Sequence, residues 1–432
     1  MKLLDGIAAS IQESALRNHV KDPVLIGLSG GADSVALLCG LLHMREKGIQ
    51  VFAVHVNHGL RESSLKDADF CRILCMKLKV PLKVISVHVS QTGSIEASAR
   101  KERYNAFYNS MKELNARTLA LAHHADDQAE TVLMHLFYGT GTSGLSGMQE
   151  YNDPIWRPLI AYRHTELVSA LLEIGQTWRE DETNNDTAYT RNYLRHCVIP
   201  QIEKAYPQAV RSINRSAVVL QSENEWIQKQ ANDWLSSHGS KSYFHFIELS
   251  GFLTIHTSLQ RRILLTYADR LGLHLEFSHV EELRSAVACR KKANLPNGWH
   301  AVSTSERLHF IPPSQEKLVW NKNVISIEPI VENFGDGRLL QAVPTELLER
   351  AVIRTRRAGD RITPFGMKGS MKLKDYLIDR GVDQPFRDSW PMLCDGSEVL
   401  WVIGIGASQL LNVSSLDKAV MVHFTNKLPD SL

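Results

Sequence analysis

A short loop of glycine and serine, between a predicted strand and a predicted helix, constrains this chain more than any other segment. It follows the apolar residues 24–28, which we expect to form a buried strand, and leads into the apolar residues 35–42, which we expect to be helical. Glycines let the backbone approach a ligand closely, and the free N–H groups of a first helical turn attract anions. Serine hydroxyls can add hydrogen bonds to phosphate oxygens. The sequence therefore predicts a phosphate site formed by Ser29, Gly30, Gly31, Ala32, Asp33 and Ser34.

This loop is not a Walker loop, because no Gly-Lys-Ser/Thr sequence ends it. It resembles the SGGxDS loop of the pyrophosphatase-type ATP-binding superfamily, whose members cleave ATP between the α and β phosphates and adenylate a carbonyl-type oxygen. An ordinary strand–helix turn of small residues is the alternative. The resemblance implies ATP as co-substrate, and Mg²⁺ that arrives with ATP rather than at a site of protein ligands alone.

Strand and helix patterns alternate through the first half of the chain. Strands are expected at 51–56, 82–87 and 118–122, and helices at 68–78, 94–114 and 126–137. Such alternation predicts an α/β fold with a doubly wound parallel sheet, whose ligands bind at the carboxyl ends of the strands. Long helical stretches follow, then a mixed segment interrupted by proline, then short strands and turns. We expect four parts: an α/β domain (1–215), a helical middle domain (216–315), a linker (316–345) and a small α+β C-terminal domain (346–432).

Composition points to an ordinary globular protein of the cytoplasm. The chain has 432 residues, 44% of them apolar and 22% charged, with a net charge of +2. It contains no apolar run long enough to span a membrane, and its first 20 residues read as a short amphipathic helix rather than a signal peptide. None of its six cysteines forms a Cys-x-x-Cys pair, which argues against a zinc ribbon or a disulfide framework.

A second polar motif, His-His-Ala-Asp-Asp-Gln-Ala-Glu-Thr at 123–131, follows the strand expected at 118–122. It therefore lies at the same sheet edge as the first loop. His123 and Asp127 are four residues apart and can face one side of the first helical turn. A histidine and carboxylates beside ATP can bind magnesium, orient an amine or accept its proton. The alternatives are a helix cap made by the acidic residues, and a metal site.

Three further segments give weaker signals. His55 lies near the end of the second predicted strand, where it can contact ATP or simply fill a strand position. Arg100 and Arg103 share a face of the helix expected at 94–114, and spacing alone favours a solvated salt-bridge face. The glycine-rich segment 138–148 follows a helix, so it is interpreted as a flexible loop near the site and not as a dinucleotide motif.

Two arginine-rich segments are candidates for substrate contacts. Arg191 and Arg195 are four residues apart, with Asn192 between them, and follow the acidic residues 180–186. They can hold an amino acid and an RNA phosphate, or can belong to an exposed turn and a capped helix. A basic segment spans residues 354–380, and dense positive charge is typical of phosphate-backbone binding, although a solvated surface is the alternative. Its basic residues include Arg354, Arg361, Lys368, Lys372 and Lys374.

Taken together, these motifs resemble the tRNA(Ile)-lysidine synthase family over almost the whole chain. The matching segments are SGGADS, HVNHGLR, EASARKERY, HHADDQAET, GTGTSGLSGM, RPL, DETNNDTAYTRNYLRHCVIP and GDRITPFGMKGSMKLKDYLIDRGV. The resemblance implies that residues 1–215 bind ATP and catalyse, that 216–315 recognise tRNA, and that 346–432 bind tRNA. It also overrules the surface interpretation of Arg103, and makes Arg103, His123 and Asp127 the catalytic candidates.

The implied reaction is the ATP-dependent ligation of L-lysine to C2 of the wobble cytidine in tRNA(Ile) with a CAU anticodon. ATP would adenylate the cytosine oxygen, and the lysine ε-amine would then displace AMP, which changes codon reading from AUG to AUA. The residues implied for substrate or tRNA are Arg100, Glu130, Arg191, Asn192, Arg195, Arg361, Lys368, Lys372 and Lys374, and no obligatory protein partner is expected. The alternatives are a tRNA thiolase of the same superfamily, for which Cys71 and Cys75 are the only close cysteine pair, and a non-catalytic tRNA-binding protein.

Overall fold

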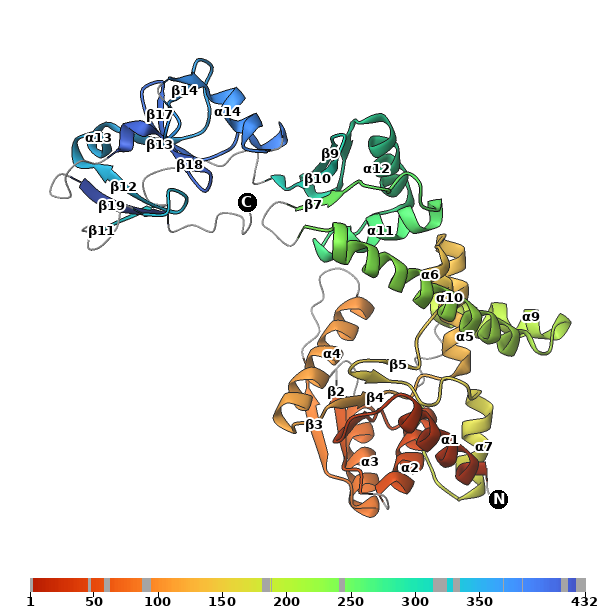
Figure 1. The fold of residues 1–432 in the computed structure, drawn as a ribbon. Helices are drawn as coiled ribbons and strands as arrows, with labels where there is room; N and C mark the ends of the chain where they lie inside the picture. The colour runs from red at the N-terminus through yellow and green to blue at the C-terminus, as the bar shows by residue number, and fades with distance from the viewer. Residues whose placement is uncertain are drawn as a thin grey trace. The chain divides into compact units, whose positions relative to one another are not determined.

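The chain divides into two compact units, residues 1–226 and 227–432, in a computed structural model (Figure 1). The structure describes residues 3–45, 48–57, 63–87, 95–180, 187, 189–240, 245–313, 325–328, 335–367, 369–382, 384–412 and 419–424. Within these residues, no helix is long and apolar enough to cross a membrane.

The first unit is built on the predicted parallel sheet. Its strands are β1 (Val24–Gly27), β2 (Val51–Asn57), β3 (Leu82–Ser86), β4 (Thr118–Ala120), β5 (Tyr151–Asn152) and β6 (Ile155–Trp156). They lie in the order β3-β2-β1-β4-β6-β5, and all neighbours are parallel except β5 and β6. The fold class predicted from the alternating pattern is confirmed.

Helices cover both faces of this sheet. The helices of the first unit are α1 (Leu3–Arg17), α2 (Ala32–Arg45), α3 (Ser63–Leu78), α4 (Ile95–Glu113), α5 (Ala125–Tyr138), α6 (Thr142–Leu145), α7 (His164–Glu173), α8 (Thr190–Tyr193), the π-helical turn η2 (Leu194–Val198), α9 (Ile199–Ala205) and α10 (Ala209–His238), the last of which continues into the second unit. Helices α1, α2 and α7 pack against one another (Figure 1). Successive β1 residues serve the two faces: Val24 and Ile26 pack with α2, whereas Leu25 packs with Phe107 of α4. This alternation follows from the two-residue period of a strand.

The second unit begins with the helices expected of the middle domain, which are confirmed, and with a sheet that the sequence pattern did not reveal. Helices α11 (Thr257–Arg270) and α12 (Phe277–Cys289) pack on an antiparallel sheet of β7 (His245–Glu248), β10 (Arg307–Ile311), β9 (His300–Ser303) and β8 (Lys292–Asn294), with the 3-10 turn η3 at Pro296–Gly298. The buried Phe252, Tyr267 and Phe310 form part of their shared core. The strands are short, which explains why the helices dominate the pattern of this region.

The rest of the second unit contains two further sheets. One is β11 (Ile325–Glu328), β19 (Ala419–Phe424) and β12 (Leu340–Pro344); the other contains β13 (Val352–Arg354), β16 (Met392–Asp395), β17 (Glu398–Val402), β14 (Arg361–Ile362) and β15 (Met371–Lys372), with β18 (Gly406–Ala407) on β17. Helices α13 (Thr345–Arg350) and α14 (Leu373–Asp379) and the turns η6 (Gln384–Phe386) and η7 (Gln409–Leu411) complete this part.

The segment 316–345, expected to be a linker, supplies two strands to the first of these sheets. Its β12 pairs with β19 near the end of the chain, and the buried indole of Trp401 donates to the carbonyl of Gly337 at 3.1 Å. The described residues of this segment therefore belong to the C-terminal body. Sequence reasoning missed this because a strand partner some 80 residues away leaves no local signal.

Candidate active site

The order of the parallel strands determines where the two polar motifs meet. The chain runs from β1 outward to β2 and β3, and then returns to the other side of β1 as β4. Such a reversal opens a crevice beyond the carboxyl ends of the two strands, which is where open α/β sheets bind ligands. The glycine–serine loop follows β1 and the His-His-Ala-Asp-Asp motif follows β4, so the two motifs flank this crevice.

The loop between β1 and α2 is held in shape by its own serine. The Ser34 hydroxyl donates to the carbonyl of Gly31 at 2.9 Å and lies 3.2 Å from the backbone nitrogens of Ser29 and Gly30. Gly30 has a φ of +94°, a conformation that side chains rarely adopt, and a Cβ there would lie 3.3 Å from Sγ of Cys71. The loop therefore requires glycine at position 30 for two reasons, backbone conformation and close packing.

His55 supports this loop from behind. Its buried Nδ1 lies 2.9 Å from the carbonyl oxygen of Leu28 and 3.5 Å from Sγ of Cys71. Burial lowers the pKa of His55, so its imidazole is neutral at pH 7. These contacts describe a residue that positions the start of the loop. A direct contact between His55 and ATP stays a prediction.

The amino end of α5 combines a helix cap with acidic chemistry. His124 is the capping residue. Its side-chain Nδ1 accepts from the backbone N–H of Asp126 at 3.2 Å, and the backbone N–H of His124 donates to Oδ2 of Asp127 at 3.1 Å. One carboxylate oxygen of Asp127 therefore serves the helix cap, which the sequence analysis gave as the alternative to a catalytic role. Its other oxygen, Oδ1, faces the arginines of η2 and α8, so capping and site chemistry are compatible.

Two carboxylates and two arginines form a compact charged cluster beside this cap. The fully buried Glu130 accepts from Nε of Arg195 at 2.6 Å and from Nε of Arg191 at 2.7 Å. Oδ1 of Asp127 accepts from Arg195 at 2.9 Å and from Arg191 at 3.3 Å. Burial alone would raise the pKa of Asp127, but the charges of His124 and Arg191 outweigh it and hold that pKa below its usual value.

His123 lies in positive surroundings and is neutral at pH 7. Burial lowers its pKa to about 4, and the guanidinium of Arg157 adds to this effect against the opposing charge of Asp127. Its Nδ1 is buried and has no hydrogen-bond partner in the described part of the chain. A neutral imidazole with an unused nitrogen is suited to bind a ligand atom, whereas a pKa this low makes it a weak base.

Asp33, the acidic residue of the glycine–serine loop, faces two imidazoles. Its Oδ1 lies 2.7 Å from Nδ1 of His164, at the start of α7, and its Oδ2 lies 3.6 Å from Nε2 of His124. The sequence reasoning missed both histidines. His124 belongs to the motif at 123–131, so its position in the sequence could have identified it as a residue of the site. His164 lies 131 residues from Asp33, and nothing local to it marks a site.

The other predicted residues of this unit lie on exposed or partly exposed surfaces. Arg100 and Arg103 are exposed on α4, where the Arg100 guanidinium sits 5.1 Å from the ring centre of Tyr104. Asn192 is half-buried in α8. The predicted catalytic role of Arg103 and the ligand roles of Arg100 and Asn192 stay predictions. The segment 181–186 lies outside the described residues.

The glycine-rich segment expected to be a flexible loop is anchored. The Gln128 side chain donates to the carbonyl of Met148 at 2.9 Å and accepts from the Met148 N–H at 2.7 Å. Gly147 has a φ of +62°, and a Cβ there would lie 2.7 Å from the Gln128 side chain. This glycine is therefore explained by close packing against α5.

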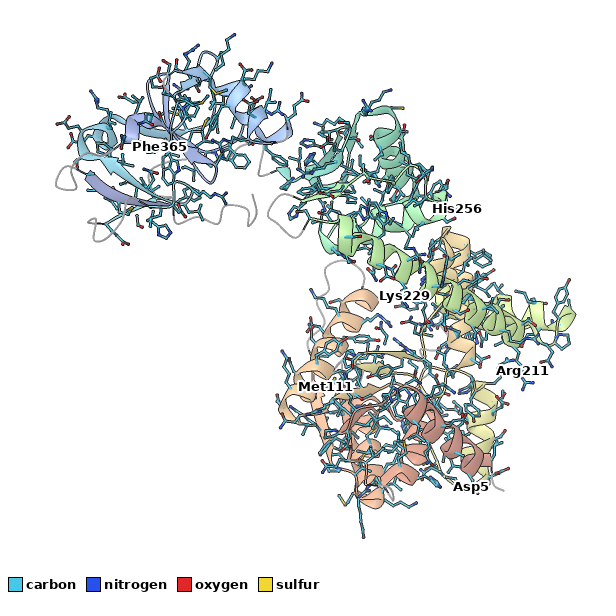
Figure 2. The ribbon with its side chains drawn as sticks, in the orientation of Figure 1. Asp5, Met111, Arg211, Lys229, His256 and Phe365 are labelled. Atoms are coloured by element: carbon cyan, nitrogen blue, oxygen red, sulfur yellow. The ribbon has the colours of Figure 1, made fainter. Side chains whose placement is uncertain are left out.

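The second unit displays part of the predicted basic surface. Arg361 and Lys372 are paired across β14 and β15, and both are exposed, as is Lys374. Phe365, labelled in Figure 2, is 61% exposed between these strands. Arg354 does not belong to this surface, because it is buried in a two-fold ion pair with Asp360 at 2.8 Å. Lys368 lies outside the described residues.

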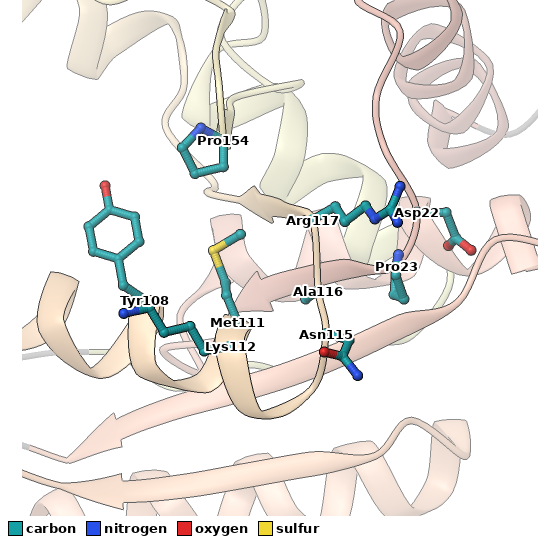
Figure 3. A pocket seen from close by; sticks show the side chains of 9 residues that line it. All are labelled: Asp22, Pro23, Tyr108, Met111, Lys112, Asn115, Ala116, Arg117 and Pro154. Atoms are coloured by element: carbon teal, nitrogen blue, oxygen red, sulfur yellow. The ribbon is translucent and has the colours of Figure 1, made fainter. Parts of the chain in front are cut away.

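A cavity of about 930 Å³ opens at the other edge of the parallel sheet (Figure 3). Its lining includes Pro23 and Arg117, which directly precede β1 and β4, together with Tyr108 and Met111 of α4. These residues mark the amino ends of the strands. The cavity is thus separate from the crevice where the two polar motifs meet, and ligands of such sheets bind at the opposite edge.

Comparison with known families identifies both ends of the chain. The PP-loop domain family matches residues 6–202, and the TilS substrate C-terminal domain family matches residues 351–424. The tRNA(Ile)-lysidine synthase of Porphyromonas gingivalis is 30% identical to this chain over 449 residues, which cover 96% of this chain and 97% of that protein. The chain belongs to the tRNA(Ile)-lysidine synthase family. The family resemblance of the sequence motifs is therefore confirmed.

Other members of the family match to a similar extent. The tRNA(Ile)-lysidine synthase of Clostridium perfringens is 30% identical over 462 residues, or 97% of each chain. That of Chromobacterium violaceum is 32% identical over 409 residues, which cover 89% of this chain and 91% of that protein. Among solved structures, a TilS C-terminal domain is 21% identical, with a TM-score of 0.21, and covers 32% of this chain and 93% of its own.

Proposed function

We infer that this chain is an ATP-dependent ligase that joins L-lysine to the wobble cytidine of tRNA(Ile) with a CAU anticodon. The observation that carries this inference is the meeting of the SGGADS loop and the His-His-Ala-Asp-Asp motif at the reversal point of the parallel sheet, in a chain of the lysidine synthase family. A carbon–nitrogen bond forms, and ATP is converted to AMP and pyrophosphate.

The loop after β1 would bind the phosphates of ATP. The Ser34 hydroxyl holds the loop from inside, while the dipole of α2 favours negative charge at its amino end. Asp33, whose carboxylate oxygens are the hard ligands that Mg²⁺ prefers, would hold the ion that accompanies the nucleotide. When bound, that ion neutralises phosphate charge; the protein itself orients ATP so that the cytosine oxygen can attack the α phosphorus.

The charged cluster beside α5 would bind free lysine. Arg191 and Arg195 offer planar guanidinium groups to the α-carboxylate, and the buried Glu130 holds both in place. Asp127 remains ionised at neutral pH and can attract an ammonium group. Lysine carries one carboxylate and two ammonium groups, so a cluster with both signs of charge matches it better than it matches a neutral substrate.

The amine must lose a proton before it attacks C2, because a free lysine ε-amine has a pKa of about 10.4. Asp127 would orient the ammonium group. His123 is neutral and has an unused Nδ1, so it can accept a hydrogen bond from the amine or donate one to phosphate through its other nitrogen. Arg103 would add positive charge near the AMP leaving group.

The exposed basic residues of the C-terminal part would hold tRNA by its phosphates. The residues that we propose for this contact are the exposed Arg361, Lys372 and Lys374, together with Lys368. We propose the limits 1–215 for the catalytic domain and 216–315 for the tRNA-recognition domain. The C-terminal tRNA-binding domain would comprise 346–432 together with the strands β11 and β12. We also propose the cytoplasm as the location of this protein, because ATP, lysine and tRNA all occur there.

The thiolase alternative fits the cysteines poorly. Cys71 and Cys75 are buried in α3, and burial raises the pKa of their thiols to about 12 and about 11. A sulfur carrier needs an accessible thiol that ionises near neutral pH. Sulfur transfer through this pair would therefore require the helix to open.

The deciding experiment incubates the protein with ATP, labelled lysine and an unmodified tRNA(Ile) transcript with a CAU anticodon. We expect label in the tRNA, together with AMP and pyrophosphate. A matched transcript with uridine in place of the wobble cytidine should receive no label. Formation of ADP, or incorporation of sulfur rather than lysine, would overturn the assignment.

A further inference from the structure

Three potential metal ligands from distant parts of the chain converge beside the carboxyl ends of β1 and β4. One ligand atom each of Asp33, His124 and His164 lies within 4.8 Å of the other two. They come from the loop after β1, the cap of α5 and the first residue of α7. Each of these backbones is fixed by its own secondary structure, so the convergence is a property of the fold and not of one flexible segment.

The chemistry of this ligand set differs from that of a magnesium site. Two imidazoles and one carboxylate suit Zn²⁺, Co²⁺ and related ions, whereas Mg²⁺ prefers oxygen ligands and retains water. Bonds of about 2.1 Å in a tetrahedral arrangement place ligand atoms roughly 3.4 Å apart. The 3.6 Å between Asp33 and Nε2 of His124 is close to that value, whereas the 2.7 Å between Asp33 and Nδ1 of His164 is a hydrogen bond that an ion would have to replace. His164 is half exposed and can adjust to an ion.

A second layer of contacts supports one of the imidazoles. Nδ1 of His124 lies 3.4 Å from Oδ2 of Asp126, so it can donate to this carboxylate while Nε2 binds an ion. Asp126 is in turn fixed by Nε of Arg163 at 2.7 Å and by the backbone N–H of His164 at 2.8 Å. A carboxylate that accepts from the second ring nitrogen of a metal-binding histidine is a common support in zinc proteins. Ion binding would replace the 3.2 Å capping contact between His124 and the Asp126 N–H.

We propose that Asp33, His124 and His164 form a binding site for a divalent transition-metal ion of the Zn²⁺ or Co²⁺ type in the nucleotide-free protein. Asp127 can supply a further ligand, because its Oδ2 lies 3.5 Å from Nε2 of His124. The inference does not depend on the ligase reaction. Since Asp33 belongs to the phosphate-binding loop, an ion at this site would occupy the residue that we assign to Mg²⁺ and ATP.

The test is a titration of the untagged, full-length, nucleotide-free protein with Co²⁺. Co²⁺ bound by imidazoles in a four-coordinate, tetrahedral site absorbs visible light far more strongly than the octahedral aqueous ion. We expect one such ion per chain, displaced by Zn²⁺ and retained in excess Mg²⁺. His164→Ala and Asp33→Asn should each weaken binding at least tenfold, since losing even a group behind a metal ligand costs about 10–100-fold.

The matched control is His43→Ala. His43 is also half exposed and lies 3.9 Å from a carboxylate, that of Asp5, but the pair is not part of the three-residue cluster. This variant should bind Co²⁺ like the unchanged protein. Thermal denaturation of each variant shows whether it is folded. The proposal is overturned if Co²⁺ does not bind, if excess Mg²⁺ removes it, or if folded His164→Ala and Asp33→Asn proteins bind it unchanged.

Discussion

Replacing Gly30 by alanine should damage the phosphate loop much more than it damages the fold. The φ of +94° at Gly30 disfavours any side chain, at a cost of about 1–2 kcal/mol, and the new Cβ would lie 3.3 Å from Sγ of Cys71. In a unit of about 200 residues this cost lowers the melting temperature by roughly 2–8 °C. If the loop relieves the strain by moving its N–H groups, ATP affinity should fall at least tenfold, which corresponds to about 1.4 kcal/mol.

Substitutions at two other glycines, Gly175 and Gly31, serve as controls that distinguish backbone strain from an effect on the phosphate loop. Gly175 has a φ of +66°, and a Cβ there would have no atom of the described residues within 4 Å, so Gly175→Ala should lower the melting temperature without changing ATP affinity. A Cβ at Gly31 would meet only ordinary contacts at 3.5 Å and 3.9 Å, so Gly31→Ala should melt like the unchanged protein. Calorimetric ATP binding and thermal melts of the three variants check this. Unchanged ATP affinity in Gly30→Ala, or equal loss in Gly175→Ala, would refute the reasoning.

Three further predictions concern the site and the tRNA surface. Alanine at Arg103, His123 or Asp127 should lower kcat by on the order of 10², the scale of a positioned acid–base or electrostatic group, and near-normal turnover would remove that residue from the site. The pKa of His123 is lowered from 6.5 to about 4, so the unfolded chain takes up a proton at this residue before the folded chain does as the pH falls. The free energy of unfolding should therefore decrease by up to about 3 kcal/mol between these pH values. In denaturant titrations, His123→Asn should make the free energy of unfolding less dependent on pH. Changing Arg361, Lys372 and Lys374 to glutamate should weaken tRNA binding and flatten its dependence on salt, as measured by filter binding, whereas equal affinity and slope would show a merely solvated surface.

The sequence predicted those features that depend on local patterns. The strand before Ser29, the helix after Ser34 and the alternating strands and helices up to β4 are encoded by neighbouring residues, so the parallel sheet and its two polar motifs could be predicted. The prediction that both motifs lie at one edge followed from the rule for parallel strands. The same local reasoning explains why His123 and Asp127 could be chosen from a single motif.

Features that depend on distant partners could not be predicted. The contact of His164 with Asp33 joins residues 131 positions apart, and β12 pairs with a strand near the end of the chain. Arg354 illustrates the same limit, because a run of basic residues gave no sign that this one is buried against Asp360. A high density of basic residues along the sequence therefore predicts a basic surface only for those residues that are exposed and not paired with a buried carboxylate.

The most direct test of the central claim is a single-turnover measurement with tRNA(Ile), [α-³²P]ATP and lysine added in sequence. Without lysine, the account predicts that AMP becomes covalently attached to the tRNA. With lysine, it predicts that this AMP is released as the amino acid is incorporated, and that Asp33→Asn prevents the first step while tRNA still binds. Release of AMP without prior attachment to tRNA, or attachment of AMP to lysine instead, would contradict the account.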